Sequence, residues 1–252
     1  MLRHRVIPFL LIKDGGLVKT REFRDPRYIG DPLNSIKIFN DKEVSELALL
    51  DISRSAQGLG PDFEMVRDIA GECFIPLSYG GGVGSIDDAA RLFSLGVEKV
   101  IVKTAAIRSP KLVNEISTLA GSQSVAVCVD VDRGRFGKMR IYAPGTDLHR
   151  DAEWTDYVRE LCDRGAGEVI IQSVNRDSSM SGLDLDAISA VANAVEVPIV
   201  AVGGVGSMED MRRGISAGAS AIGAGSYFVF HGPRRAVLIT YPEYSELLSI
   251  IG

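Results

Sequence analysis

The chain has 252 residues, of which 46% are hydrophobic, and it carries a formal net charge of −5. The acidic balance and the lack of a basic block with interleaved aromatics argue against nucleic acid as a partner. No apolar stretch is long enough to cross a bilayer, and the start (MLRHR) lacks the apolar middle of a signal peptide. We therefore expect a cytoplasmic protein with one globular domain over residues 1–252.

Apolar runs alternate with amphipathic segments from end to end. The predicted strands are 6–12, 47–52, 74–77, 99–102, 125–129, 168–171, 199–202 and 219–222. The predicted helices are 32–39, 62–69, 86–95, 110–119, 151–164, 183–194, 208–217 and 243–251. Near-continuous apolar strands are typical of parallel sheets covered on both faces. Eight such units predict an α/β protein with a (β/α)₈ TIM barrel, and an open doubly wound sheet is the alternative.

Two glycine-rich segments, residues 78–85 (SYGGGVGS) and 201–207 (AVGGVGS), follow predicted strands and precede predicted helices. Glycine lets backbone N–H groups approach an anion, and a helix N-terminus favours negative charge. The pattern therefore indicates two phosphate-binding loops, although a single glycine run is more often a tight turn. The same offset of 122 positions relates Gly81 to Gly203, Asp88 to Asp210, Gly96 to Gly218, Thr104 to Ser226 and Glu46 to Glu168. A constant offset over this span indicates an internal twofold repeat, and so a barrel of two halves.

The two longest predicted loops, residues 20–31 and 132–151, follow the first and fifth predicted strands. In a barrel of this kind the active site is built from loops at the strand C-termini. These loops are therefore candidate lids, and passive surface loops are the alternative.

The cysteines and histidines show no metal or redox spacing, so we expect three buried thiols, no metal and no organic cofactor. These residues are Cys73, Cys128, Cys162, His4, His149 and His231.

Dispersed motifs over nearly the whole chain carry a resemblance to a known family. They are Arg5, Lys13-Asp14-Gly15, Val18-Lys19, Gly30-Asp31-Pro32, Leu50-Asp51-Ile52, Gly80-Gly81-Gly82, Asp130, Gly165-Ala166-Gly167-Glu168, Arg176-Asp177, Ser181-Gly182 and residues 201–206. With them the chain resembles HisF, the cyclase subunit of imidazole glycerol phosphate synthase.

The resemblance implies a twofold-repeated barrel that forms a heterodimer with a glutaminase subunit (HisH-like). Ammonia from glutamine would pass through the barrel to a bisphosphorylated substrate at the strand C-termini. The reaction of ammonia with this substrate would yield imidazole glycerol phosphate and an aminoimidazole carboxamide ribotide. The residues that it places around the phosphates and substrate are Lys19, Asp51, Gly81, Gly82, Lys103, Thr104, Asp177, Gly203, Gly204, Gly225 and Ser226.

The resemblance also implies a gate at the ammonia entrance. Its salt-linked charges would be Arg5, Glu46, Lys99 and Glu168, near the beginnings of four predicted strands. Solvated edge residues are the alternative interpretation, because exposed ion pairs are common and contribute little stability.

The chain departs from the family at the residues that carry the chemistry. Of the family's two catalytic aspartates, Asp130 is present, but Leu11 occupies the other position and can transfer no proton. Lys103 replaces an asparagine, Ser178 a glycine, and Val202 a serine. The tail from residue 226 to 242 also differs from the usual polar final helix.

Three functions remain open at this point. One is a cyclase that uses Asp130 as general acid/base. A second is a subunit that channels ammonia to another acceptor, as in HisF-like paralogues that accompany sugar-modifying amidotransferases of surface polysaccharide pathways. In that case an acetamido sugar would be held by a third protein, and the apolar tail would bind that protein or cover the top face. A core-packing tail is the alternative. The related isomerase of the preceding step ranks last, because it also needs both aspartates.

Overall fold

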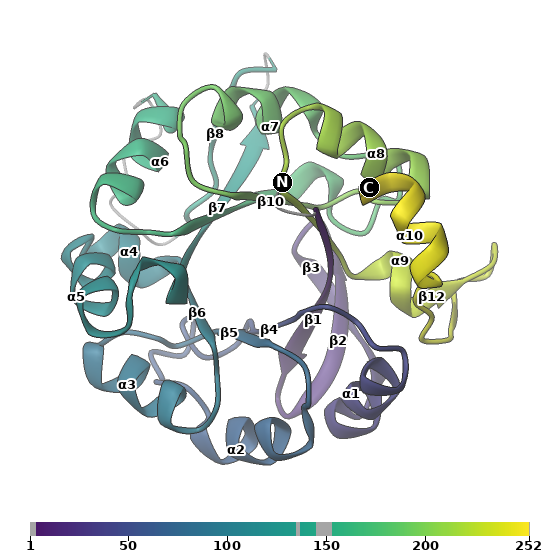
Figure 1. The fold of residues 1–252 in the computed structure, drawn as a ribbon, viewed down its shortest axis with the longest axis horizontal. Coiled ribbons are helices and arrows are strands. Elements are labelled where there is room, and N and C mark those ends of the chain that lie inside the picture. Colours follow the sequence, from purple (N-terminus) through teal and green to yellow (C-terminus); the bar gives the residue numbers. More distant parts are fainter. Residues whose placement is uncertain (1–3, 135–136, 145–152, 252) are drawn as a thin grey trace.

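The computed structural model describes residues 4–134, 137–144 and 153–251. Within them, eight parallel strands close into a barrel, because the first strand pairs with the last as well as with the second (Figure 1). The barrel strands are β1 (Arg5–Lys13), β4 (Leu47–Asp51), β5 (Leu77–Gly80), β6 (Lys99–Val102), β7 (Val125–Arg133), β9 (Glu168–Ser173), β10 (Ile199–Val202) and β11 (Ala221–Ala224). The predicted (β/α)₈ barrel is confirmed.

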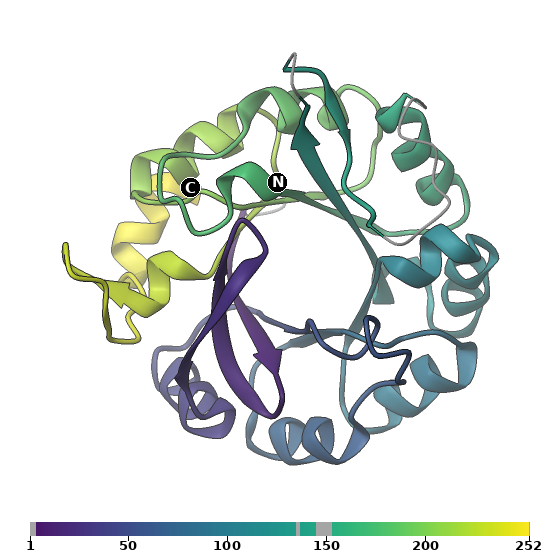
Figure 2. The same ribbon diagram turned by 180° about the vertical axis from the view of Figure 1, so that it is seen from behind.

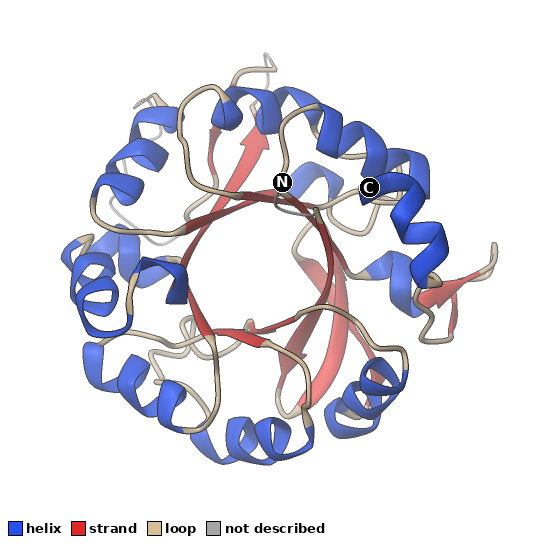
Figure 3. Cartoon of the chain, in the orientation of Figure 1, coloured by secondary structure: helices blue, strands red, loops and turns tan. Residues whose placement is uncertain are grey.

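The helices form a ring outside the strands (Figure 3). They are α1 (Pro32–Asp41), α2 (Phe63–Glu72), α3 (Ile86–Ser94), α4 (Thr104–Arg108), α5 (Lys111–Ala120), α6 (Trp154–Asp163), α7 (Leu185–Ala192), α8 (Met208–Ser216), α9 (Ser226–Val229) and α10 (Tyr244–Ile251), with 3-10 turns η1 (Ser122–Ser124) and η2 (Val174–Arg176). The main core lies between strands and helices. A second apolar cluster, built on side chains such as Ile7, Ile101 and Val200, fills the barrel interior.

The internal repeat is visible in the hydrogen bonds that start α3 and α8. Ser85 Oγ accepts from Asp88 N–H at 3.1 Å, and Ser207 Oγ accepts from Asp210 N–H at 3.1 Å. Each aspartate accepts in turn from a glycine N–H of its loop, Gly84 or Gly206, at 3.0 Å. The two glycine loops thus share these helix-capping hydrogen bonds as well as one sequence pattern.

The loop predicted at residues 20–31 is mostly an antiparallel hairpin, β2 (Gly16–Arg21) and β3 (Arg24–Gly30), which extends the sheet from β1. Figure 2 shows it in purple, standing over the face where the strands end. The chain reverses at Glu22 and Phe23, which both adopt positive φ angles. In the loop predicted at 132–151, β8 (Met139–Ile141) pairs with β7, and residues 135–136 and 145–152 lie outside the described structure.

Two predicted strands were misplaced by two to three residues. The strand expected at 74–77 begins at Leu77, and Phe74 is 84% exposed. The apolar run from Phe74 is an entry segment: Phe74 N–H donates to the Asn40 side chain, and the Pro76 carbonyl accepts the first bond from Leu47. The strand expected at 219–222 is β11, which runs from 221 to 224.

The tail beyond β11 leaves the site and runs down the outside of the barrel. It forms a small hairpin, β12 (Phe230–His231) with β13 (Ala236–Val237), at the outer edge beside α9 (Figure 1). Tyr241 then donates its hydroxyl to the Val6 carbonyl at 2.8 Å, at the opposite end of the barrel. Phe228 and Phe230 are buried, whereas Leu238 is 53% exposed, so the tail is only partly a core-packing segment.

Candidate functional site

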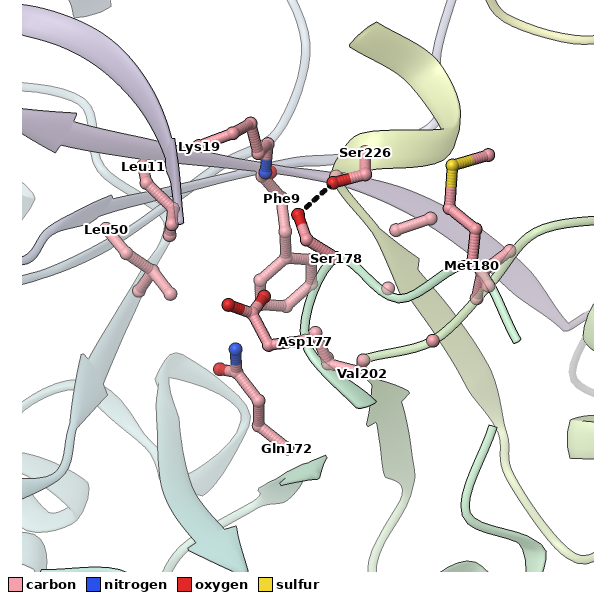
Figure 4. Close-up of a pocket in the computed structure, with 16 residues that line it drawn as sticks. Phe9, Leu11, Lys19, Leu50, Gln172, Asp177, Ser178, Met180, Val202 and Ser226 are labelled. Atoms are coloured by element: carbon pink, nitrogen blue, oxygen red, sulfur yellow. Dashed lines mark hydrogen bonds between the residues drawn. The ribbon is translucent and has the colours of Figure 1, made fainter. Parts of the chain in front are cut away.

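A pocket opens where β1, β4, β10 and β11 end, on the same face as the β2–β3 hairpin (Figure 4). Its polar wall includes Lys19, Gln172, Asp177, Ser178 and Ser226. Its apolar side is formed by Phe9, Leu11, Leu50 and Val202. Of the residues predicted to hold phosphate, the structure brings Lys19, Asp177, Gly203, Gly204, Gly225 and Ser226 together around this one pocket.

Leu11 lies on the apolar side of the pocket, beside Leu50. The two are register partners on neighbouring strands, so their side chains share the same face of the sheet. Leu11 is 8% exposed. An alkyl group at this position leaves this side of the pocket without a proton donor or acceptor.

Asp130 is buried in β7 and forms an ion pair with Lys103. Burial is the largest single influence on the pKa of the Lys103 ammonium and lowers it, but the attraction and hydrogen bond of Asp130, with smaller contributions from Cys128 and Tyr142, together raise that pKa. The ammonium also lies 5.6 Å from the centre of the Phe23 ring, at the hairpin turn. Cys128 Sγ approaches Asp130 Oδ1 at 3.4 Å, and burial, followed by repulsion from Asp130, raises the pKa of this thiol. Asp130 is therefore engaged in an ion pair with Lys103.

Lys19 is a buried cation on the β2–β3 hairpin. Its Nζ donates to the Phe9 carbonyl at 2.8 Å. Burial lowers the pKa of Lys19 to about 8, against an opposing attraction from Asp177. A Cβ atom at Gly225 would lie 2.8 Å from that same carbonyl oxygen, so glycine is required where the lysine and the loop meet.

Asp177 anchors the hairpin over the site. Its Oδ2 accepts from Thr20 Oγ1 at 2.8 Å and from Phe23 N–H at 3.2 Å. Burial raises the pKa of Asp177, and these two hydrogen bonds oppose the shift. Thr20 and Phe23 were not singled out from the sequence. Their only signal was their position in a long loop after the first strand.

Ser178 follows Asp177 with a φ of 57°. This left-handed conformation costs a residue with a side chain roughly 1–2 kcal/mol. Its hydroxyl is buried against the hydroxyl of Ser226, shown as a dashed line in Figure 4. Gly203 and Gly204 line the same pocket, with φ angles of 96° and 103°. Ser178 was noted in the sequence only as the replacement of a glycine, and Gln172, which also lines the pocket, was not singled out.

The first glycine loop is arranged differently. Gly82 N–H donates to Ser55 Oγ at 3.2 Å, and Gly81 packs against Asp51. Asp51 Oδ1 accepts from Ser53 N–H at 3.0 Å and from Ser53 Oγ at 2.6 Å, so this carboxylate stabilises its own loop. Thr104 begins α4, next to Lys103, whose ammonium lies on Asp130. Gly81, Gly82, Thr104, Asp51 and Lys103 do not line the pocket at the second loop.

The four predicted gate residues form a closed ring of ion pairs where the strands begin. Arg5 pairs with Glu46 and with Glu168, and Lys99 Nζ lies 3.2 Å from Glu46 and 2.6 Å from Glu168. Ser78 Oγ donates to Glu46 at 2.9 Å. Burial opposes the charge of Arg5, but Glu168 and Glu46 together raise its pKa. Both carboxylates are buried, so these residues are not solvated edge charges.

Among the described residues, no group of three or more His, Cys, Asp or Glu side chains is placed to hold a metal ion. Cys128 is buried as expected, but Cys73 and Cys162 are partly exposed because both lie at helix ends near the surface. His149 lies outside the described residues. No helix in the described part of the chain has the length and apolar character needed to span a membrane.

Comparison with known proteins gives consistent matches. The family model described as "Histidine biosynthesis protein" matches residues 5–233. A Pseudomonas aeruginosa protein, provisionally named imidazole glycerol phosphate synthase subunit hisF2, is 45% identical over 98% of this chain and 99% of its own length. The imidazole glycerol phosphate synthase subunit HisF of Gluconacetobacter diazotrophicus is 39% identical over 100% of this chain and 95% of its own length.

Proposed function

The chain belongs to the HisF family of imidazole glycerol phosphate synthase subunits, and from this premise we propose that it conducts ammonia to an acceptor other than the family's cyclisation substrate. In this role it would form a heterodimer with a glutaminase subunit. Glutamine hydrolysis in that partner would supply the ammonia at the end of the barrel where the strands begin.

The observation that carries this proposal is the state of the two catalytic positions. Leu11 offers no proton, and Lys103 holds Asp130 in an ion pair. General acid–base catalysis needs a group that gives and takes a proton within reach of the substrate, and it contributes roughly 10²–10⁴-fold in rate. Position 11 carries no carboxylate, and the carboxylate of Asp130 is paired with Lys103. The barrel therefore keeps its fold but has no free general acid or base for ring closure at these two positions.

The features needed for conduction are retained. The ring of Arg5, Glu46, Lys99 and Glu168 encircles the end where the strands begin. Beyond it the barrel interior is apolar, with Ile7, Ala48, Ile101, Ala126 and Val200 buried along it. An apolar interior suits neutral ammonia better than ammonium, because burial of a bare charge is costly.

The acceptor that fits a HisF-like chain without cyclase chemistry is an acetamido sugar held by a third, amidotransferase protein. Ammonia would add to the carbonyl carbon of such an acetamido group and the carbonyl oxygen would leave, as water overall, to give an amidine, and the third protein would activate that oxygen as the leaving group. The pocket at the second glycine loop supports a phosphorylated small molecule as a ligand of this chain, because Lys19 provides a buried cation in the pocket that the glycine backbone of residues 203 and 204 also lines.

A genuine cyclase of histidine biosynthesis is the second candidate. Asp130 keeps its place on β7, and the anion pocket at the second loop is preserved. In that case Lys103 would have to release Asp130 when substrate binds.

The two candidates are separated by a cyclisation assay with ammonium salt and the family's bisphosphorylated substrate. We expect the wild-type chain to show little ring closure. The double variant Leu11→Asp, Lys103→Asn should raise turnover, because it restores one carboxylate and releases the other. A matched control is Leu50→Asp with Lys103→Asn, which also places an acid on the apolar side of the pocket but not at position 11.

The control should remain inactive while circular dichroism confirms that all three proteins are folded. Fast ring closure by the wild-type chain would overturn the proposal in favour of the cyclase.

A further inference from the structure

One contact joins the outer tail hairpin to the floor of the pocket. Arg235 Nη2 donates to the Ser178 carbonyl at 2.8 Å, and the guanidinium lies 5.9 Å from the centre of the Phe230 ring. Arg235 itself has a φ of 49° and is half-buried, whereas its neighbour Arg234 is exposed. The hairpin therefore directs one arginine inward, toward a segment that lines the pocket.

The segment that receives this arginine is held in an unfavourable backbone conformation. Ser178 and Met180 both have left-handed φ angles, 57° and 54°, and both line the pocket. Left-handed backbone is disfavoured for residues with side chains and persists where the surroundings hold it. Two contacts hold Ser178: its hydroxyl meets Ser226, and its carbonyl accepts from Arg235.

We propose that Arg235 is a positioning residue for the anion site, acting through the backbone of Ser178. With the guanidinium in place, the Ser178 carbonyl is fixed outward and its hydroxyl stays on Ser226, at the pocket floor. Without it, Ser178 relaxes from the left-handed conformation and draws its hydroxyl away from Ser226. This inference rests on the proposed function to the extent that the pocket at Gly203, Gly204 and Lys19 binds an anion.

The test measures the affinity of inorganic phosphate by titration calorimetry in the full-length chain. Arg235→Ala should weaken phosphate binding about tenfold, the loss expected for a hydrogen bond made by a charged group. Arg234→Ala, on the same hairpin but exposed, removes the same charge and should bind as the wild type does. In the double variant Arg235→Ala, Ser178→Gly, affinity should recover to that of Ser178→Gly alone, because glycine adopts the left-handed conformation without help.

Two results would overturn the inference. One is unchanged affinity in Arg235→Ala. The other is a double variant that binds about tenfold more weakly than Ser178→Gly alone, because direct attraction between the guanidinium and phosphate would then explain the loss. If the wild-type chain binds no phosphate, the proposed anion site fails, and the positioning role is decided by hydrogen exchange.

The exchange experiment follows the amides of residues 177–182, where Asp177, Ser179 and Gly182 donate backbone hydrogen bonds. Faster exchange there in Arg235→Ala, but not in Arg234→Ala, supports the positioning role. Equal protection in both variants contradicts it.

Discussion

At the scale of single residues, the site is governed by which charges are available to a ligand. Lys103 and Asp130 form an ion pair, and the Asp177 carboxylate accepts hydrogen bonds from the Thr20 hydroxyl and the Phe23 N–H. Lys19 differs, because its ammonium donates to a neutral carbonyl and its nearest carboxylate influence, Asp177, only partly offsets burial. Lys19 is therefore the pocket cation whose charge a bound anion can use.

The pH dependence of anion binding should reflect the titration of the Lys19 ammonium. Its pKa of about 8 means that the ammonium form dominates below that pH and the neutral amine above it. Sulfate does not titrate in this range, so its affinity should be flat below about pH 8 and fall up to tenfold per pH unit above it. Titration calorimetry at a series of pH values measures this.

Lys19→Met serves as the control, since it removes the titrating group. Sulfate should bind this variant weakly, with no step near pH 8. A step of the same size in the variant would assign the titration to another group.

The sequence predicted the individual residues of the site better than their contacts. Leu11 and the four ring charges were identified through the resemblance to HisF, which assigns roles to these positions at strand ends. The pairing of Lys103 with Asp130 was not predicted, because it depends on where a long side chain turns across two strands. The role of Arg235 was also hidden, since its partner Ser178 lies 57 residues earlier in the chain.

At the scale of elements, helix starts were well predicted because the signal is local. Ser85 and Ser207 each precede an apolar residue and two acids, and in the structure both cap their helices. The β2–β3 hairpin was missed for the opposite reason. Its outer strand is exposed along most of its length and contains Pro26, which in sequence is typical of a loop. Such a strand is defined by its pairing with β2 rather than by apolar periodicity.

The repeated caps give a quantitative prediction. Ser85→Ala and Ser207→Ala should each lower the free energy of unfolding by about 1 kcal/mol, because each removes one side-chain acceptor at a helix N-terminus. The losses should add in the double variant, since the two loops belong to opposite halves of the barrel and share no hydrogen-bond partner. Urea unfolding measures all three values.

Restoring the acceptor with Ser85→Asp provides the control, because aspartate caps as well as serine does. A loss at one site alone would show that the two halves are not equivalent in stability despite their shared geometry.

At the scale of the whole molecule, the two halves of the barrel share a fold, but residues at some equivalent positions differ and give the two halves different charged groups. Glu46 and Glu168 are related by the repeat offset, and they are the two acids of the charge ring. The same offset relates Lys103 to Gly225. The Lys103 ammonium pairs with Asp130. Position 225 is a glycine because Lys19 and the Phe9 carbonyl occupy the space that a Cβ atom would need. The proposed anion pocket therefore combines the glycine loop of the second half with Lys19 of the first half, whereas Lys103 is paired with Asp130.

The charge ring and the proposed anion pocket lie at opposite ends of the barrel, so a change in one should leave the other intact. Lys99→Met removes one of the two cations and leaves Glu46 and Glu168 with Arg5 alone. Breaking a buried ion pair in this way should lower the free energy of unfolding by roughly 3 kcal/mol. Sulfate affinity should stay within about twofold of the wild type, because no ring residue lines the pocket. In the complex with a glutaminase subunit, the ratio of the glutamine-driven rate to the ammonium-driven rate should change.

The comparison for this last prediction is Lys37→Met, which breaks an exposed pair with Glu72 at 3.4 Å. Exposed pairs contribute about 0–1 kcal/mol, so this variant should resemble the wild type in both stability and rate ratio. A gate differs from a purely structural ring because its residues affect the passage of ammonia. Lys99→Met must alter how glutamine-derived ammonia is used, even where free ammonium salt supports the wild-type rate. An unchanged rate ratio together with the expected loss of stability would leave the ring as a stabilising element of the barrel and exclude it as a gate.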